Sequence, residues 1–208
     1  MDFRRVRSVL DLELSDLKPN DIPGAAQLLS ASMLDNPIHI AVYGGAGKFE
    51  RQSLEGVFHA MFEQRLGEVV VARLEGEMVG IYRSYPCQGG WEITAEVQQW
   101  IESNPDSTLD YQQRSRYWRG LWASLDPTEP HNHLGPIAVR VGYQGLGVGK
   151  VLMDHYCRVL EHNRQASYLE ADKRKNVSFY QRFGYRIIRE ETLLGVLNTF
   201  MWREAQII

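Results

Sequence analysis

Apolar residues recur at helical spacing in the first third of the chain. Two stretches place them three and four positions apart, which puts them on one face of a helix. We expect one helix to begin after Asn20 or Asp21, either of which can cap it, and a second to cover residues 49–66. A run of glycines breaks the chain between the two stretches.

From residue 68 onward the spacing becomes that of β-strands. Residues 68–73 and 78–85 are rich in valine, isoleucine and tyrosine, and Glu75, Gly76 and Glu77 separate them. Two such runs joined by a tight turn predict a β-hairpin.

Beyond residue 133, strands and helices alternate. We expect a strand over 134–139, a glycine-rich turn, a helix over 148–161, a strand over 167–170, a helix over 177–183, and strands over 185–190 and 198–203. This alternation is typical of α/β proteins. The length of 208 residues fits a single domain, so we predict one α/β domain over residues 1–208.

The segment 88–133 interrupts this pattern. It is polar and rich in tryptophan, and its periodicity predicts helices over 92–102 and 109–124 on either side of Pro105. A structureless loop of this length is unusual inside a compact domain. We therefore expect a helical insertion between the hairpin and the strand at 134–139.

Composition argues against several classes of partner. Charged residues make up 24% of the chain and the net charge is −3, so no basic field attracts nucleic acid or an anionic membrane. No apolar run approaches the roughly 20 residues that span a bilayer, and residues 1–11 lack the hydrophobic stretch of a signal peptide. Cys87 and Cys157 are too few for a disulfide framework or a cysteine-rich zinc site. We expect a cytoplasmic protein, monomeric or homodimeric, that acts on a small molecule.

The segment from Gln144 to Lys150 carries the clearest chemical signal. Glycines at 145, 147 and 149 follow a predicted strand and open a predicted helix, where backbone N–H groups and the helix dipole suit a phosphate or pyrophosphate. The pattern fits neither the P-loop nor the dinucleotide-binding fingerprint, because glycine or a hydroxyl residue is missing where each requires it. On the glycines alone, an ordinary tight connection between strand and helix remains an alternative.

Two ordered motifs resemble the GCN5-related N-acetyltransferase superfamily. Gln144, Gly147 and Gly149 satisfy its pattern Q/R-x-x-G-x-G/A after the strand at 134–139, and the run from Asn176 to Tyr185 is similar to its later helix. The sequence around Tyr168–Glu170 and Asn176–Tyr180 resembles that of the puromycin acetyltransferase-like group. The resemblance implies a mostly antiparallel central sheet flanked by helices, with the insertion before the core strand.

The resemblance also implies acetyl-CoA as co-substrate. The amides of the glycine-rich turn would hold its pyrophosphate, and its pantetheine arm would run along the strand ending at Val139, where a backbone N–H would polarise the thioester carbonyl. The residues so implied are Ile137, Ala138, Val139, Gln144, Gly145, Leu146, Gly147, Val148, Gly149, Lys150, Asn176 and Phe179. Asn176 could equally be the N-cap of the last helix.

Tyr180 is the candidate general acid, since the superfamily often carries a catalytic tyrosine at this position. A phenol titrates near pH 10 and a thiol at about 8.5, so the tyrosine can stay protonated beside a departing thiolate. The alternative for Tyr180 is simple packing. Glu170 and His133 are the candidates for accepting or conducting the proton of the amine, with a solvent-exposed strand end as the alternative.

Two departures limit the analogy. The superfamily often has a glutamate on its central strand, but this chain has Gly135 and Pro136 there, which argues against direct base catalysis from that strand. His131 and His133 have no further ligand at fitting sequence spacing, so we expect no metal.

The sequence therefore predicts an acyl-CoA-dependent N-acetyltransferase that acts on a primary amine of a small molecule or peptide. A CoA-binding regulatory module without turnover, or a structural partner-binding protein, are the alternatives. The aromatic residues of the insertion could wall the acceptor pocket or belong to the core. They are Trp91, Trp100, Tyr111, Trp118 and Trp122.

Overall fold

The computed structural model describes residues 11–65, 67–89 and 109–206, together with positions 95, 99, 102 and 103. Its elements are β1 (Glu13–Asp16), the 3-10 helix η2 (Pro19–Asp21), α1 (Ile22–Met33), α2 (Pro37–Tyr43), α3 (Lys48–Glu63), β2 (Glu68–Leu74), β3 (Glu77–Cys87), α5 (Tyr111–Ser124), β4 (His131–Val139), α6 (Val148–Asn163), β5 (Ser167–Ala171), α7 (Arg174–Gln181), β6 (Arg186–Leu193) and β7 (Val196–Arg203).

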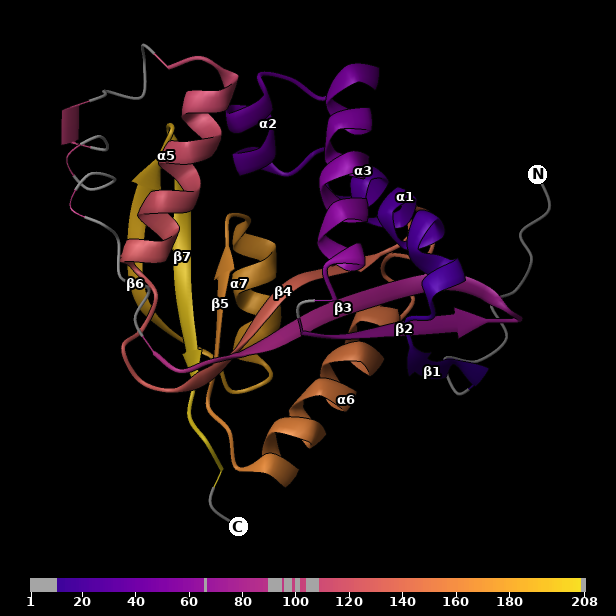
Figure 1. Cartoon of the computed structure of the whole chain (residues 1–208). Helices are drawn as coiled ribbons and strands as arrows, with labels where there is room; N and C mark the ends of the chain where they lie inside the picture. The colour runs from indigo at the N-terminus through magenta and orange to yellow at the C-terminus, as the bar shows by residue number, and fades with distance from the viewer. Residues whose placement is uncertain are drawn as a thin grey trace.

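The strands form one seven-stranded sheet in the order β1-β2-β3-β4-β5-β7-β6. Neighbouring strands are antiparallel except β4 and β5, which run parallel (Figure 1). This arrangement confirms the predicted mixed α/β fold with a mostly antiparallel sheet. The predicted hairpin is β2 and β3, joined at Glu75 and Gly76.

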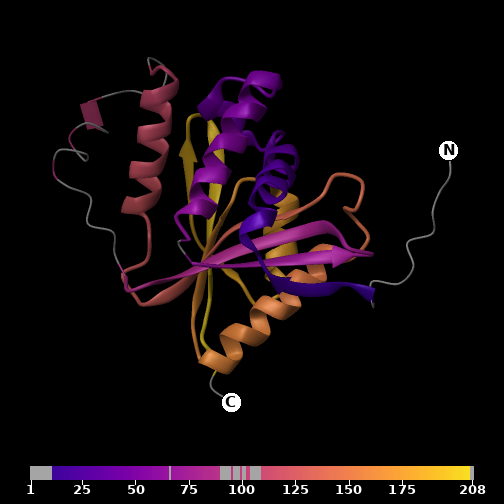
Figure 2. The ribbon, with the colours of Figure 1, turned by 45° about the vertical axis from the view of Figure 1, so that its right-hand side comes forward.

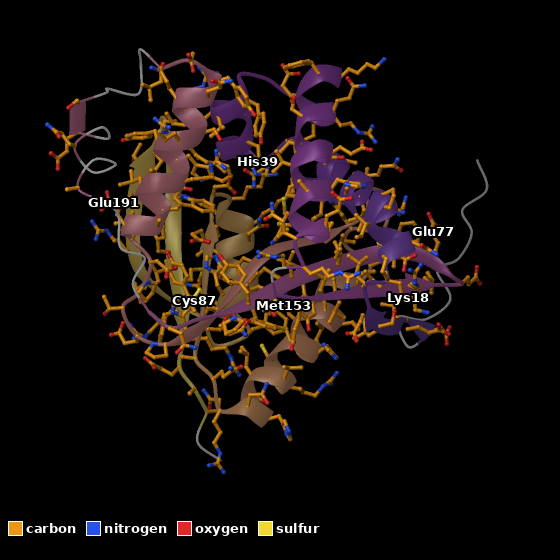
Figure 3. The ribbon with its side chains drawn as sticks, viewed as in Figure 1. Lys18, His39, Glu77, Cys87, Met153 and Glu191 are labelled. Atoms are coloured by element: carbon orange, nitrogen blue, oxygen red, sulfur yellow. The ribbon has the colours of Figure 1, made fainter. Side chains whose placement is uncertain are left out.

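Helices cover both faces of the sheet (Figure 2). Alternate strand residues point to opposite faces, so Val70 packs with α6 while Val71 packs with α1 and α3. Gly80 lets α6 approach β3, because a Cβ there would lie 2.8 Å from Val148 Cγ1. Close packing at this point fixes the first turn of α6 against the sheet, and with it the glycine-rich turn. Figure 3 labels Met153, a fully buried residue of α6.

The sequence patterns do not predict two of the elements, β1 and α2. Strand β1 is too short and polar to stand out, and its place is set by antiparallel pairing with β2. Helix α2 begins at Pro37, where the Asn36 side chain accepts from the amides of Ile38 and His39, and Gly44 ends it in the left-handed conformation. The expected break at the glycines is therefore the end of a short helix.

The predicted cap of α1 needs correction. Asp21 stands at the N-cap position, but its side chain makes no capping hydrogen bond. Its carboxylate instead lies 2.8 Å from the Arg73 guanidinium on β2. The charged partner holds the carboxylate away from the helix amides.

The predicted helix at 109–124 is α5, whereas the helix expected over 92–102, with Trp91 and Trp100, lies outside the described residues. Trp118 and Trp122 pack beside a core cluster formed with α2, β5 and β7. Trp118 and Trp122 therefore belong to the core, which is the second of the two alternatives given for these aromatic residues. In the part of the chain that the structure describes, no helix is long and apolar enough to cross a membrane.

Candidate active site

Strand β4 parts from its parallel neighbour halfway along its length. Pairing with β5 is confined to Asn132 with Ser167 and His133 with Tyr168. On the other side β4 stays paired with β3 through Val139, apart from a bulge where two residues of β4, Gly135 and Pro136, stand opposite one residue of β3. The second half of β4 therefore has a gap on its β5 side.

The end of β4 faces this gap. The Val139 carbonyl accepts hydrogen bonds from Ser32 Oγ at 3.0 Å and Gln144 Nε2 at 3.2 Å. The next amide, that of Arg140, donates to Val79 on β3. Because neighbouring residues of a strand direct their backbone groups to opposite sides, the backbone of Val139 faces away from β3. Gln144 thus braces the strand end.

The glycine-rich turn uses left-handed backbone at two positions. Gly145 has φ +77° and Gly147 has φ +93°, values that residues with a Cβ rarely adopt. Gly147 is the N-cap of α6, so the first-turn amides of that helix have no partner within it. A Cβ on Gly145 would meet nothing within 4 Å. The turn is open on its outer side rather than covered by protein.

A cavity of about 520 Å³ lies between this turn, the end of β4 and α7. Most of the residues that the sequence singled out line it. They are Ile137, Ala138, Val139, Gln144, Gly145, Gly147, Gly149, Lys150, Asn176, Phe179 and Tyr180. Leu146 and Val148 do not line it; Leu146 is exposed and Val148 packs in the core.

Basic side chains add charge to this cavity. Lys150, Lys173, Lys175 and Arg182 line it, and Lys173 Nζ lies 2.9 Å from the Asp35 carboxylate. These cations beside the amino end of α6 make the cavity suited to phosphate groups. Lys173, Lys175 and Arg182 are not among the residues that the sequence singled out, although Lys173 and Lys175 stand directly before the motif that begins at Asn176. The cavity residues Ser32, Met33, Asp35 and Asn36 carry no signal in the sequence pattern either.

Tyr180 is almost buried yet reaches the cavity. Within the described part of the chain its hydroxyl makes no hydrogen bond, whereas the nearby Tyr185 hydroxyl lies 2.7 Å from Ser167 Oγ. Burial raises the pKa of Tyr180, and the Asp172 carboxylate adds to the shift. Its phenol therefore stays protonated at neutral pH.

Asn176 lies inside α7, at its third residue, and the N-cap position belongs to Lys173. The capping alternative for Asn176 is therefore wrong, because α7 begins three residues earlier than the sequence pattern indicated. Phe179 packs near Gly149, whose added Cβ would lie 3.5 Å from the phenyl ring. Gly149 therefore lies in van der Waals reach of α7.

Glu170 and His133 form a pair at the parallel contact of β4 and β5. His133 Nε2 lies 3.0 Å from Glu170 Oε2, and both side chains are largely buried. Neither lines the cavity, and Glu170 is not the exposed strand end that the alternative proposed. Burial lowers the pKa of His133, but Glu170, Asp126 and Cys87 outweigh it and raise that pKa well above its usual range. A histidine that already holds its proton cannot accept another.

Comparison with known proteins agrees with this geometry. The model of the acetyltransferase (GNAT) family matches residues 36–185. Among solved structures, a histone acetyltransferase HPA2-related acetyltransferase from Corynebacterium glutamicum superposes with a TM-score of 0.71 at 18% identity, covering 95% of this chain and 98% of that one. Arylalkylamine N-acetyltransferase 2 from Aedes aegypti gives 0.67 at 13% identity, with coverage of 94% and 100%. A polyamine N-acetyltransferase from Drosophila melanogaster gives 0.63 at 12% identity, with coverage of 92% and 98%.

At these identities the likeness to solved structures establishes the fold, while the family model covers well over half of the chain. The resemblance to the puromycin acetyltransferase-like group stays a prediction. The strand that parts from its neighbour, the glycine-rich turn and the matched segment together place this chain in the GNAT acetyltransferase family.

Proposed function

We propose that this protein is an N-acetyltransferase that moves the acetyl group of acetyl-CoA to a primary amine of a small molecule or peptide by direct attack. The observation that carries the proposal is the cavity in which the glycine-rich turn, the free side of β4 and the basic start of α7 meet. Family membership supports acetyl-CoA as the co-substrate. When bound, it supplies an activated acetyl thioester.

The chain's own groups fit such a ligand. Amides from Gly145 to Lys150 would bind the pyrophosphate, and Lys173, Lys175 and Arg182 would balance further phosphate charge. The N–H of Val139, directed away from β3, would hydrogen-bond to the pantetheine arm as in a neighbouring strand, since the Val139 carbonyl already accepts from Ser32 and Gln144. An N–H at this strand end would also polarise the thioester carbonyl.

Tyr180 would act as general acid towards the departing sulfur. Its hydroxyl has no competing hydrogen bond in the described part of the chain, it lines the cavity, and its raised pKa keeps the proton in place until a thiolate develops. Proton donation from such a group contributes about 10²–10⁴-fold to rate.

Glu170 is the better of the two candidates for receiving the proton of the amine, with His133 as the residue that positions its carboxylate. Two residues beyond Glu170, the Asp172 carboxylate accepts a hydrogen bond from Asn36, which lines the cavity. The carboxyl end of β5, where Glu170 lies, therefore leads towards the cavity, and a water chain along it would carry the proton.

A catalytically weak, CoA-binding regulatory module is the alternative. It is favoured by one observation: β4 carries no carboxylate anywhere from His131 to Val139. The names of two structural relatives, an arylalkylamine and a polyamine acetyltransferase, instead support an amine acceptor.

The deciding experiment measures thiol release from acetyl-CoA with the purified protein across arylalkylamines, polyamines, aminoglycosides, amino acids and peptide N-termini. We expect at least one class to accelerate release well above the rate without acceptor. A thermal shift with acetyl-CoA but no acceptor-dependent release would favour the regulatory module. No thermal shift at all would overturn both readings.

A further inference from the structure

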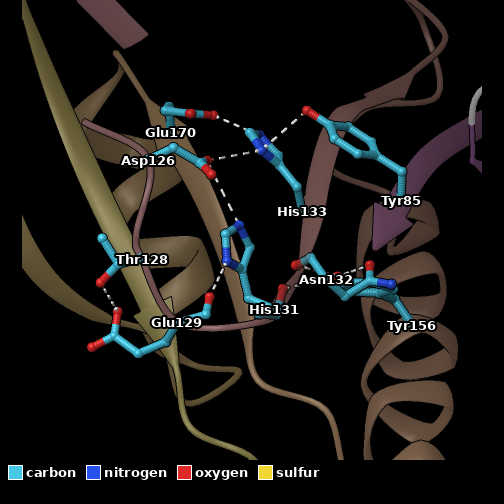
Figure 4. A network of polar contacts seen from close by, with 10 residues as sticks. Tyr85, Asp126, Thr128, Glu129, His131, Asn132, His133, Tyr156 and Glu170 are labelled. Atoms are coloured by element: carbon cyan, nitrogen blue, oxygen red, sulfur yellow. Dashed lines mark hydrogen bonds and ion pairs between the residues drawn. The ribbon is translucent and has the colours of Figure 1, made fainter. Parts of the chain in front are cut away.

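A second group of reactive side chains lies at the opposite end of β4 from the cavity. We call Cys87, Asp126, His131 and His133 the Cys87 cluster. The antiparallel register sets Cys87 directly opposite His131, and His133 lies two residues further along the same face. Asp126 comes from the loop after α5 and reaches between the two imidazoles (Figure 4). Cys87 itself is labelled at the end of β3 in Figure 3.

The ligand atoms of the cluster are close together. The sulfur of Cys87 and a ring nitrogen of each histidine all lie within 4.8 Å of one another. Asp126 Oδ1 lies 3.6 Å from His131 Nε2 and 3.7 Å from His133 Nδ1. These separations exceed the usual 2.7–3.2 Å of a hydrogen bond. They approach the roughly 3.3 Å that separates nitrogen and oxygen ligands placed tetrahedrally at about 2.0–2.1 Å from zinc.

Each histidine is oriented by its other ring nitrogen. His131 Nδ1 lies 2.8 Å from the carbonyl oxygen of Glu129, and His133 Nε2 lies 3.0 Å from the Glu170 carboxylate. Donation to a carbonyl or carboxylate is how zinc-bound histidines are commonly fixed. It leaves His131 Nε2 and His133 Nδ1 directed towards Asp126 and Cys87, and zinc would displace any proton that these two nitrogens carry.

Two polar atoms of the cluster are buried without a hydrogen-bond partner. In the described part of the chain, His131 Nε2 and Asp126 Oδ2 make no hydrogen bond. The His131 side chain is 0% exposed and that of Asp126 is 4% exposed. An unpaired buried polar atom is costly, and buried charges are normally paired or coordinate a metal.

From this geometry we infer that Cys87, Asp126, His131 and His133 form a zinc site. The Cys87 sulfur and the two imidazole nitrogens supply three ligands, and Asp126 Oδ1, which lies near both imidazoles, would move in as the fourth. Four protein ligands arranged tetrahedrally would leave no open position, so the site would be structural. It would fasten the loop that follows α5 to the ends of β3 and β4.

One existing contact must yield to the metal. The Tyr85 hydroxyl lies 3.1 Å from His133 Nδ1, and its ring stacks on the imidazole at 4.9 Å. Zinc would occupy the nitrogen lone pair that the hydroxyl now approaches, while the stacked ring would still hold the imidazole plane. The proposal does not depend on acetyl transfer, because its observable is metal content.

The test measures zinc in the full chain purified without chelators, by elemental analysis, and then cobalt binding to the metal-stripped protein. We expect about one zinc per chain and a tetrahedral cobalt spectrum with a sulfur-to-metal charge-transfer band. Cys87→Ser should lose that band and reduce zinc content at least about tenfold. Cys157→Ser removes the other cysteine, on α6, and should keep both signals.

Because Cys87→Ser could fail to fold, circular dichroism accompanies each variant, and the cobalt spectrum of the unmodified chain stands by itself. A folded wild-type protein that holds no zinc and gives no cobalt–thiolate band would overturn the proposal. So would equal metal content in folded Cys87→Ser and Cys157→Ser.

Discussion

The two ends of β4 carry sites of opposite construction. At its carboxyl end the cavity combines backbone, from the glycines at 145, 147 and 149 and the side of Val139 that faces away from β3, with basic side chains at its rim. At its amino end the Cys87 cluster is made of buried side chains from β3, β4 and the loop after α5. The first site can take a long, flexible, anionic ligand because it is open, whereas the side chains of the second are buried and converge on one another.

The difference also governs how each site depends on the rest of the fold. The turn is one continuous segment and is held by the packing of α6 on Gly80. The cluster needs three segments to arrive together, so a change in any of them would loosen it.

Gly147→Asp should abolish detectable acetyl-CoA binding. The new carboxylate would repel the pyrophosphate that the amides of the glycine-rich turn would bind, and a Cβ would strain a residue with φ +93°. Calorimetric titration with acetyl-CoA checks this. Gly76→Asp is the matched control, since it makes the same substitution at φ +82° in the open turn between β2 and β3. Retained affinity in folded Gly147→Asp would mean that the turn does not bind the pyrophosphate.

Tyr180→Phe should lower kcat about a hundredfold, in the range of general acid catalysis, and change the acetyl-CoA Kd less than about twofold. Steady-state kinetics and titration separate the two effects. Tyr185→Phe removes a hydroxyl bonded to Ser167 and should instead cost about 1 kcal/mol of stability with kcat preserved. Equal kcat in Tyr180→Phe and the wild type would return Tyr180 to a packing role.

Removal of zinc should lower the thermal midpoint by about 5–10 °C, if zinc at a hundred times its Kd contributes about 2.7 kcal/mol. Differential scanning calorimetry with and without a chelator measures the shift. The same treatment of Cys87→Ser should change nothing further. An unchanged midpoint in the zinc-loaded wild type would show that the cluster does not fasten the fold.

Lys175→Gln should weaken acetyl-CoA binding only about two- to fivefold, because an exposed charge contributes little. The loss should shrink as salt rises, which titration at two ionic strengths detects. Lys48→Gln, at the exposed start of α3, is the control and should leave the affinity unchanged. A loss of affinity that is the same at both ionic strengths would mean that Lys175 has a role other than attracting phosphate.

The sequence by itself determined the fold class, the hairpin and the order of elements after residue 130. It also determined that Gln144–Lys150 is a glycine-rich turn between a strand and a helix. These are local features: periodicity and glycine placement act within a few residues, so they can be read along the chain. The same locality explains the errors at Asp21 and Asn176, where a cross-strand arginine and an earlier helix start changed the capping.

Only the tertiary structure decided which distant residues meet. The sequence offered His131 and His133 no further ligands, yet β3 pairing and the loop after α5 bring Cys87 and Asp126 beside them. The tertiary structure likewise brings Ser32 to the end of β4 and places Glu170 beside His133. Long-range strand register and helix packing set these contacts, and neither leaves a periodic trace in the chain.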